Sequence, residues 1–299
     1  MILGVDIGGT AVKMGLVDRD GTVRAQHEAP VDFDGYRTPV LTTVIREAAD
    51  FLKKSGAAAE AIGVSATGQI DENEGTVIGS NGRIPGYEGS KIGDEMRAAF
   101  GVPVRVANDA NAAALGECIA GAGRGFSDVL MVTIGTGVGG GLVLGGRLYG
   151  GSRGIAGEIG HFTLYQDGIP CSCGKRGCYE CYASAAALVR AAKAACGEEK
   201  MDGREIFRRV SAGDHVMKAV LEHWMQDVAA GITGLVHILN PQAVIIGGGV
   251  SGQKELFIDP LRGMILNGAM PRFTEYLQVL QAQLGNTAGL IGAAGLFRE

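Results

Sequence analysis

The chain of 299 residues carries a formal net charge of −5 and has a sequence pI of about 5.6, which gives no sign of the basic patch that a nucleic-acid partner would need. Hydrophobic residues make up 46% of the sequence and charged residues 20%, which suits a globular protein with a sizeable core. No apolar run reaches the roughly 18 residues of a membrane span, and the first residues lack the basic and apolar regions of a signal peptide. We therefore expect a cytoplasmic protein that binds neither nucleic acid nor a membrane.

Glycine is the unusual residue of this composition. It occupies 50 of the 299 positions, more than twice the usual share of about 7%, while the 8 prolines exclude a collagen-like chain. Residues 131–160 hold 12 of these glycines. A cluster of this density indicates tight turns or a close approach of the backbone to a ligand.

Strands and helices are predicted in turn along the first part of the chain. Short runs of branched apolar residues, separated by turn signals such as residues 18–21, indicate strands. Apolar side chains at helical spacing end before Gly56, which is a stop signal. The predicted strands are 2–7, 12–17, 22–27, 61–65 and 102–106, and the predicted helices are 37–54, 91–100 and 109–120.

A second set of strands follows, and most of the remaining chain is predicted to be helical. Residues 5–8 (Val-Asp-Ile-Gly) align with residues 132–135 (Val-Thr-Ile-Gly) at an offset of 127 residues, and both are strands that run into a glycine turn. This match predicts an internal duplication with two related α/β domains. The predicted strands are 128–134, 139–144, 147–149 and 243–246, and the predicted helices are 183–196, 203–210, 214–239, 253–266 and 288–297.

The first glycine turn is a candidate phosphate-binding loop. Gly8, Gly9 and Thr10 follow Asp6 and precede Lys13, and consecutive glycines after a strand let backbone N–H groups point at an anion. The turn is neither a Walker loop nor a dinucleotide fingerprint, because a strand follows it instead of a helix. The aspartate could hold Mg²⁺ through water. A tight hairpin with an incidental acid is the alternative interpretation.

Two further glycine runs fit the same ligand class. Residues 135–141 contain 5 glycines, more than a hairpin turn needs, which favours a phosphate-binding role over a structural one. Gly247, Gly248 and Gly249 lie between a predicted strand and a predicted helix, where a nucleotide's sugar or base would fit. Taken alone, this third run suits a packing turn equally well.

Asp109 is the candidate general base. The run Asn108-Asp109-Ala110-Asn111 lies between a predicted strand and a predicted helix, and α/β sheets usually bind ligands at the carboxyl ends of their strands. The competing interpretation makes Asp109 a capping residue at or near the start of the helix, and base rates favour it.

A dense group of cysteines indicates a zinc site. Cys171, Cys173, Cys178 and Cys181 lie within eleven residues, and His161 precedes them; in a reducing compartment such a group favours a metal over disulfides. Two ligand sets are open at this point, either the four cysteines or His161 with three of them. Because four protein ligands leave no open position, the zinc would be structural.

Together these motifs resemble those of the ROK family of sugar kinases (repressors, open reading frames and kinases). The matching residues keep the family's order over nearly the whole chain and are Asp6-x-Gly8-Gly9-Thr10, Asn108-Asp109, Gly135-Thr136-Gly137-x-Gly139-Gly140, Glu158-x-Gly160-His161, Cys171-x-Cys173-Gly174-x-x-Gly177-Cys178-x-Glu180 and Leu290-Ile291-Gly292-Ala293. The resemblance implies an actin-like (ribonuclease H-like) duplicated α/β fold with two domains flanking a cleft. We expect a small domain of residues 1–107 plus 288–299 and a larger domain of residues 108–287 that holds the zinc loop.

The resemblance also implies ATP-dependent phosphorylation of a hexose or N-acetylhexosamine hydroxyl, with Mg²⁺ neutralising the phosphates. Asp109 matches the base that takes the hydroxyl's proton as the oxygen attacks the γ-phosphate. The implied sugar-binding residues are Gly68, Asn81, Asn108, Asp109, Glu158, His161 and Glu180. The implied ATP-binding residues are Asp6, Gly8, Gly9, Thr10, Lys13, Thr136, Gly137, Gly247, Gly248 and Gly249. The implied zinc ligands are His161, Cys171, Cys173 and Cys178, which leaves Cys181 as a spare thiol.

The loop expected to shape the sugar pocket departs from the family. Many members have Pro-Gly where this chain has Thr67-Gly68, and they often have Leu and a nearby Trp after the sugar-contact asparagine, where Asn81 is followed here by residues 82–87 (Gly-Arg-Ile-Pro-Gly-Tyr). Glucose, N-acetylmannosamine, fructose and β-glucosides are therefore all candidate substrates.

The sequence leaves two alternatives to a kinase to consider. A non-catalytic sugar-binding or sensing protein is the main alternative, but it would not need a carboxylate at Asp109. The family's repressors carry an additional N-terminal helix-turn-helix domain, for which a phosphate-loop strand that starts at residue 2 leaves no room. We also expect the protein to form a homodimer or a homotetramer.

Overall fold

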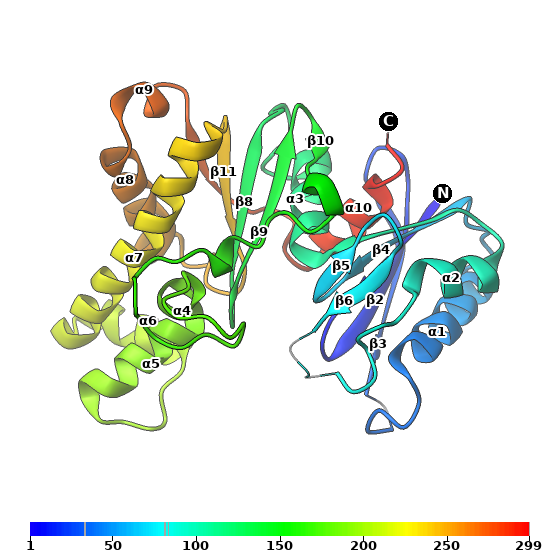
Figure 1. Ribbon diagram of the computed structural model, residues 1–299, viewed down its shortest axis with the longest axis horizontal. Helices are drawn as coiled ribbons and strands as arrows, with labels where there is room; N and C mark the ends of the chain where they lie inside the picture. Colours follow the sequence, from blue (N-terminus) through cyan, green and yellow to red (C-terminus); the bar gives the residue numbers. More distant parts are fainter. Residues whose placement is uncertain (33, 81, 83, 299) are drawn as a thin grey trace. The chain divides into compact units, whose positions relative to one another are not determined.

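The computed structural model describes residues 1–32, 34–80, 82 and 84–298, and the chain divides into two compact units (Figure 1). The first unit comprises Met1–Val129, Gly141–Gly157 and Gln283–Glu299, and the second comprises Leu130–Gly140 and Glu158–Ala282. The predicted division into residues 1–107 with 288–299 and residues 108–287 stays a prediction. Each unit is described by itself below.

The first unit contains a five-stranded mixed sheet with the strand order β3-β2-β1-β4-β7. Strands β1, β2 and β3 are antiparallel neighbours joined by short turns, whereas β4 and β7 run parallel to β1. Strand β1 covers the predicted residues, while β3 and β7 end later than predicted. The strands are β1 (Ile2–Ile7), β2 (Ala11–Val17), β3 (Val23–Pro30), β4 (Ala61–Ala66) and β7 (Val104–Asn108).

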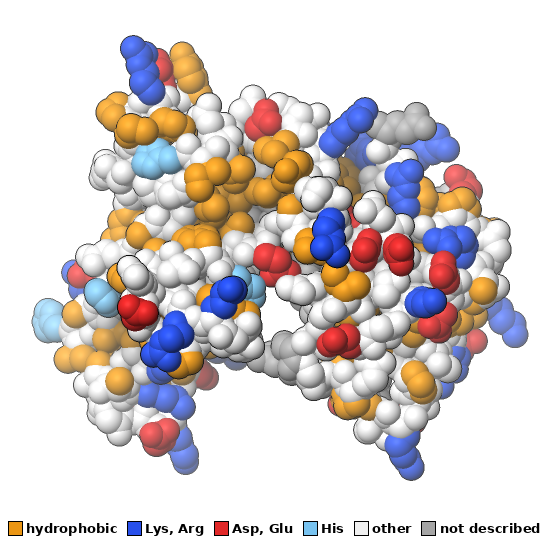
Figure 2. Space-filling view, viewed as in Figure 1, with side chains coloured by type: hydrophobic (Ala, Val, Ile, Leu, Met, Phe, Trp, Pro, Cys, Tyr) orange, Lys and Arg blue, Asp and Glu red, His pale blue; other side chains and the backbone are white. Residues whose placement is uncertain are grey.

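Helices α1 (Val40–Ser55) and α2 (Ile92–Phe100) lie side by side against this sheet (Figure 1). Their apolar faces share one core with β1, β2 and β4. Helix α1 begins three residues later than predicted because Pro39 has an extended backbone, with ψ 140°, and a residue before proline avoids helical geometry. Figure 2 shows basic and acidic side chains interspersed over the surface of this unit.

A short hairpin of the first unit was missed by the sequence analysis. It consists of β5 (Gln69–Asp71) and β6 (Thr76–Gly79), which pair antiparallel. Strands of three and four residues are too short for an alternating pattern to stand out. The turn of this hairpin is formed by residues 72–75.

Helices α3 (Asp109–Ala120) and α10 (Ala288–Gly295) pack closely on each other in the first unit. Every residue of α10 is buried. The close approach depends on glycine, because a Cβ built at Gly292 would lie 2.5 Å from the carbonyl carbon of Ala112 and 2.9 Å from the backbone nitrogen of Gly116. Helix α10 also contacts β1 and β4, so it lies between the sheet and α3.

The second sheet repeats the arrangement of the first, with the order β10-β9-β8-β11-β12. Strand β9 pairs antiparallel with β10, and β11 pairs parallel with β12. The turn at residues 135–137 joins β8 to β9 as the turn at residues 8–10 joins β1 to β2, in agreement with the predicted duplication. The strands are β8 (Val129–Ile134), β9 (Val138–Leu144), β10 (Arg147–Leu148), β11 (Ala243–Gly247) and β12 (Gln278–Gln281).

Strand β10 and the end of β9 belong to the first unit, and helices make up most of the second unit outside the remaining strands. Polar side chains cap the helices that the sequence predicted: Ser184, Asp202 and Asp214 accept hydrogen bonds from the first turns of α5, α6 and α7. The single helix predicted at residues 253–266 is instead a π-helical turn (Lys254–Ile258) followed by α8. The helices are α4 (Glu180–Ala183), α5 (Ala185–Cys196), α6 (Gly203–Ser211), α7 (His215–Leu239), α8 (Asp259–Gly268) and α9 (Pro271–Thr274).

Among the described residues, no helix has both the length and the apolar character that crossing a membrane requires.

Candidate functional site

The first glycine turn joins β1 to β2 and has its own internal hydrogen bond. The Gly8 N–H donates to the Ala11 carbonyl at 3.0 Å, so this N–H serves the turn. Gly9 and Thr10 are exposed, and the Tyr36 hydroxyl donates to the Gly9 carbonyl at 3.1 Å. The backbone N–H groups of residues 9 and 10 are therefore the ones in this turn that could meet an anion.

Asp6 lies at the end of β1, next to this turn. Its Oδ1 accepts a hydrogen bond from Ser65 Oγ at 2.6 Å, and Lys13 is its cross-strand partner on β2. Burial raises the pKa of Asp6, although the Ser65 hydrogen bond and the Lys13 charge oppose the rise. Ser65 was missed by the sequence analysis, because only the parallel register of β1 and β4 places it opposite Asp6.

The second glycine turn also has an internal hydrogen bond, but the bond closes a turn one residue shorter. The Gly135 N–H donates to the Gly137 carbonyl at 3.0 Å, and Thr136 is exposed as Gly9 is in the first turn. A Cβ built at Gly137 would lie 2.6 Å from Glu180 Oε2, so the carboxylate of Glu180 lies directly beside the turn. Thr136 and Gly137, two of the predicted phosphate-binding residues, are thus on the open part of a hairpin.

The capping residue of α3 is Asn108, and the neighbouring Asp109 also accepts a hydrogen bond in the first turn, from the Ala110 N–H to Asp109 Oδ1 at 2.8 Å. Asn108 Oδ1 accepts from the N–H groups of Ala110 at 2.9 Å and Asn111 at 3.3 Å, while Asn108 Nδ2 donates to the Gly68 carbonyl at 2.9 Å. Asp109 is the first residue of the helix proper. Its carboxylate therefore lies at the carboxyl end of β7 and shares the Ala110 N–H with the Asn108 side chain.

Two acidic groups of the first unit, Asp6 and Asp109, lie close enough to Tyr87 to act on it electrostatically. The Tyr87 side chain is 2% exposed, and its hydroxyl has no hydrogen-bond partner among the residues that the structure describes. Burial raises the pKa of Tyr87, and the negative charges of Asp109 and then Asp6 raise it further. The fold thus brings Asp6 and Asp109, which are far apart in the sequence, to one region around Tyr87.

The predicted metal ligands of the second unit form a compact cluster. One ligand atom from each of His161, Cys171, Cys173 and Cys178 lies within 4.8 Å of the others. The Sγ atoms of Cys173 and Cys178 are 3.6 Å apart, and Cys171 Sγ is 3.7 Å from His161 Nδ1. Cys181 is not part of this cluster; its Sγ is 3.8 Å from the Pro170 carbonyl oxygen.

These separations fit a tetrahedral zinc ion. With Zn–S bonds of about 2.3 Å and Zn–N bonds of about 2.0–2.1 Å, tetrahedral geometry sets ligand atoms roughly 3.5–3.8 Å apart. Both measured separations, 3.6 and 3.7 Å, fall in this range. The donor set of three thiols and one imidazole is also typical of structural zinc. Of the two sets left open by the sequence, the described residues gather the one that contains His161.

The loop that carries the cysteines is anchored to helix α7. Tyr165 donates a hydrogen bond from its hydroxyl to Asp227 Oδ1 at 2.5 Å, and Asp227 is 7% exposed. This bond raises the pKa of Tyr165 to about 12. The two residues are 62 positions apart in the sequence, and no periodic pattern predicts this contact.

His161 lies between two carboxylates that were predicted to bind sugar. Its Nδ1, the nitrogen near Cys171, is 3.7 Å from Glu180 Oε1, and its Nε2 is 3.8 Å from Glu158 Oε2. Although 43% of the Glu158 side chain is exposed, burial of the rest raises its pKa; His161 opposes the rise and Glu180 adds to it. A metal on Nδ1 would leave Nε2 as the N–H that faces Glu158.

The third glycine run has a packing role as well as a place for a ligand. A Cβ built at Gly248 would collide with the backbone of Ile134 on β8, and one built at Gly247 would lie 2.9 Å from Met131 Cε. Nothing lies within 4 Å of a Cβ built at Gly249. Packing against the Ile134 backbone accounts for Gly248, whereas the flexible end of the Met131 side chain could move away from a side chain at Gly247. Asn81, a predicted sugar contact, lies outside the described residues.

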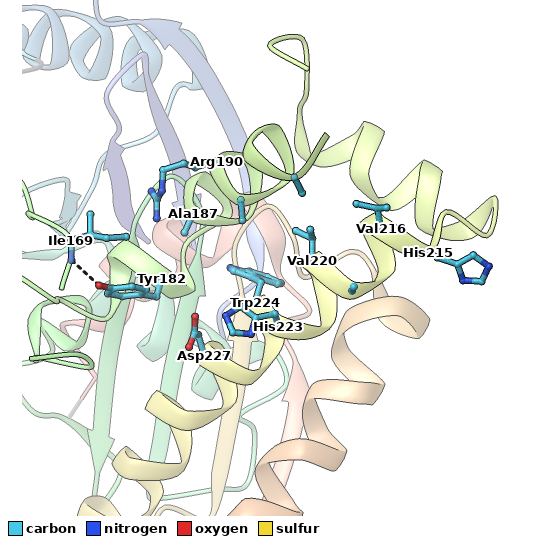
Figure 3. A pocket seen from close by; sticks show the side chains of 13 residues that line it. Ile169, Tyr182, Ala187, Arg190, His215, Val216, Val220, His223, Trp224 and Asp227 are labelled. Atoms are coloured by element: carbon cyan, nitrogen blue, oxygen red, sulfur yellow. Dashed lines mark hydrogen bonds between the residues drawn. The ribbon is translucent and has the colours of Figure 1, made fainter. Parts of the chain in front are cut away.

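A cavity of about 730 Å³ lies between α5 and α7 of the second unit (Figure 3). Its lining is mainly apolar and includes Trp224, Val216 and Val220, with Arg190 and Asp227 at the edge. None of the residues predicted to bind sugar, ATP or metal lines it.

Comparison with known proteins agrees with the order of these motifs. Residues 2–299 match the ROK family. The chain belongs to the ROK family. This chain is 33% identical over 314 residues to a glucokinase of Thermotoga maritima, and the match covers 100% of this chain and 97% of the relative. The predicted family is therefore confirmed.

Solved structures of ROK proteins superpose on the whole chain. A ROK glucokinase from Streptomyces griseus, solved in complex with glucose and AMPPNP, is 35% identical with a TM-score of 0.81 and covers 99% of this chain and 98% of its own. A ROK hexokinase from Thermus thermophilus is also 35% identical, with a TM-score of 0.85 and coverage of 98% and 96%. These matches confirm the predicted actin-like α/β fold.

Proposed function

We propose that this ROK protein transfers the γ-phosphoryl group of ATP to a hydroxyl group of a hexose or N-acetylhexosamine, with Asp109 as the general base. The coarser assignment, a sugar kinase, follows from the family and from full-length matches to a glucokinase and a hexokinase. The choice of sugar, the base and the phosphate-binding turns are the finer parts of the proposal; the geometry of the described residues supports the base and the turns, and the relatives support the sugar.

The observation that carries the base is the division of roles between Asn108 and Asp109. Asn108 is the N-cap of α3 and accepts from two N–H groups of its first turn, whereas Asp109 Oδ1 shares one of them, that of Ala110. Asp109 also influences Tyr87 electrostatically together with Asp6. A carboxylate at the end of a parallel strand, beside a second acid near a glycine turn, suits a base that works next to bound phosphates.

In the proposed reaction Asp109 accepts the proton of the sugar hydroxyl while the hydroxyl oxygen bonds to the γ-phosphorus and ADP leaves. The turns at residues 8–10 and 135–137 would hold the phosphates through backbone N–H groups, and residues 247–249 would lie against the adenosine. Mg²⁺, when bound, would neutralise the charge of the phosphates. Lys13, opposite Asp6, adds a positive charge near the first turn.

Glucose is the first substrate to test. The glucokinase relative and the ROK glucokinase crystallised with glucose and AMPPNP support this choice, while N-acetylmannosamine, fructose and a β-glucoside remain the alternatives. The sugar contacts proposed besides Asp109 are Gly68, Asn81, Asn108, Glu158, His161 and Glu180.

The proposed zinc has a structural role, because four protein ligands leave no position open for catalysis. When bound, it would hold the loop at residues 161–178 and fix the orientation of the His161 ring. His161 Nε2 would then keep its proton and donate it in a hydrogen bond, either to Glu158 or to a sugar hydroxyl.

A coupled assay of ADP release across a panel of hexoses and N-acetylhexosamines tests the reaction. We expect glucose to give turnover, and we expect Asp109→Asn to lower kcat by roughly 10²–10⁴-fold, the usual contribution of general base catalysis. Zinc content and the far-UV CD spectrum of this variant should match those of the wild type.

Asp94→Asn is the matched control, because this exposed aspartate of α2 pairs only locally with Arg97 at 2.7 Å. It should keep wild-type kcat. Near-wild-type turnover by Asp109→Asn would contradict the assignment of the base, and binding of glucose without turnover would favour the sensing protein.

Two further expectations stay predictions. The homodimer or homotetramer is measured by light scattering coupled to size-exclusion chromatography. The cytoplasmic location is measured by fractionation of cells that express the protein at its natural level.

A further inference from the structure

The carboxylate of Glu72 contacts the first turn of α3. Glu72 Oε1 accepts a hydrogen bond from Asn111 Nδ2 at 3.0 Å, and the backbone N–H of Asn108 donates to the same carboxylate. Burial raises the pKa of Glu72 despite these two hydrogen bonds. Asn111 is 1% exposed, so its N–H donor has little access to water. Glu72 thus contacts the residues on both sides of Asp109.

Two glycines of the loop after β10 make room for this side chain. A Cβ built at Gly150 would lie 3.0 Å from Glu72 Oε2, and a Cβ built at Gly154 would lie 2.8 Å from the Glu72 backbone nitrogen. Gly154 also has φ +76°, a conformation that other residues rarely adopt. The glycines near residue 150 therefore have a physical reason, since any side chain there would press on Glu72.

The residues that flank β5, Gly68 and Glu72, both contact the junction between β7 and α3. At one end the Gly68 carbonyl accepts from Asn108 Nδ2 at 2.9 Å, and at the other end Glu72 accepts from Asn111 and from the Asn108 backbone. All these residues belong to the first unit. The hairpin therefore holds residues on both sides of Asp109, namely Asn108 and Asn111.

We propose that Glu72 is a positioning residue, which holds the β7–α3 junction so that the Asp109 carboxylate keeps its orientation. The inference rests on the proposed role of Asp109. Glu72 acts through Asn111 and through Asn108, which is itself a proposed sugar contact. Loss of the Glu72 contacts should therefore lower the rate of the chemical step and, through Asn108, weaken sugar binding, while affinity for ATP stays almost unchanged.

The effect on rate follows from the geometry. Truncation of Glu72 to alanine removes the acceptor of two donors at the start of α3, one of which belongs to a buried side chain. The helix start would then shift or loosen, and a displacement of about 1 Å at a catalytic group costs about 10²-fold in rate. Glu72→Gln keeps the size of the side chain and one acceptor oxygen, so it should rescue most of the loss.

Steady-state kinetics of three purified variants test the proposal. We expect Glu72→Ala to lower kcat by about 10- to 100-fold and to leave the KM for ATP within about threefold of wild type, while the KM for the sugar rises because Asn108, a proposed sugar contact, is displaced. Glu72→Gln should stay within about threefold of wild type in all constants. Glu74→Ala is the control, since Glu74 is exposed in the same turn, and it should be unchanged.

Hydrogen exchange provides a readout that does not depend on turnover. In Glu72→Ala the amides of residues 108–111 should exchange at least roughly tenfold faster than in wild type, whereas in Glu74→Ala they should not. Wild-type kcat in Glu72→Ala, alongside an inactive Asp109→Asn, would overturn the positioning role and leave the proposed function intact. If the wild type phosphorylates no sugar, the proposed function fails. Unchanged hydrogen exchange in Glu72→Ala would then overturn the positioning role of Glu72 as well.

Discussion

The substitution Gly292→Ala should destabilise the protein strongly, although alanine favours helices. Gly292 lies inside α10, where a Cβ would be 2.5 Å from the carbonyl carbon of Ala112 and 2.9 Å from the Gly116 nitrogen. Both are backbone atoms, so no rotamer change can move them away. The added methyl group must push α10 away from α3, in a place where every residue of α10 is buried.

The magnitude follows from two opposed effects. Overpacking of a well-packed core costs about 1–3 kcal/mol and occasionally more, and we place this site at the upper end because the obstacles are backbone. Replacing glycine by alanine inside a helix returns about 1 kcal/mol. The free energy of unfolding should therefore fall by about 2 kcal/mol.

Gly234→Ala is the matched control. Gly234 is an exposed position of α7, with nothing within 4 Å of a built Cβ, so the same substitution should stabilise the protein by up to about 1 kcal/mol. The two variants differ by one methyl group each from wild type, but their effects should have opposite signs.

Urea unfolding followed by far-UV CD measures both changes. The single tryptophan, Trp224, lies on α7 of the second unit, so its fluorescence reports separately on that unit. An unfolding midpoint of Gly292→Ala equal to or above that of wild type would refute the close packing of α3 and α10.

Two further predictions concern the metal and the pH dependence of stability. Elemental analysis should find about one zinc per chain, retained in Cys181→Ser and lost in Cys178→Ser; loss in Cys181→Ser would favour the four-cysteine set. For Asp6, burial raises the pKa above its ordinary value of 3.8, so this group stabilises the fold at low pH and its contribution is lost as the pH rises through the raised pKa. Without ligands, Asp6→Asn should therefore gain thermal stability relative to wild type between pH 4 and pH 7, and a constant difference over this range would contradict the reasoning.

The parts of the fold that follow from local patterns were predictable. Strand β1 at residues 2–7 and helix α3 at residues 109–120 match their predicted bounds, because turn and capping residues border a clear apolar pattern. Strands β5, β6 and β12 were missed. They are three or four residues long, and what makes them strands is pairing with a distant neighbour, which a local window does not contain.

In the candidate site, too, local sequence predicts some features, whereas others depend on contacts between distant residues. The glycine turns and the Cys/His cluster follow from composition and spacing within short segments, so the sequence located them. Which residue caps α3 depended on backbone geometry, and Asn108 and Asp109 are both good caps by residue type. The contact of Glu72 with Asn111 spans 39 residues, and nothing in either local sequence signals the other.

Helix α10 has a consequence for how the protein is made. The sheet of the first unit is synthesised by residue 108, yet the helix that contacts β1 and β4 and packs on α3 begins at Ala288. At about 5–20 residues per second, the ribosome needs roughly ten seconds or more to reach it. During that interval the first unit emerges without the segment that completes its interior, while most of the second unit leaves the ribosome before that segment does. The order of synthesis therefore does not match the order in which the units can finish folding, and the nascent first unit is where a chaperone would be needed.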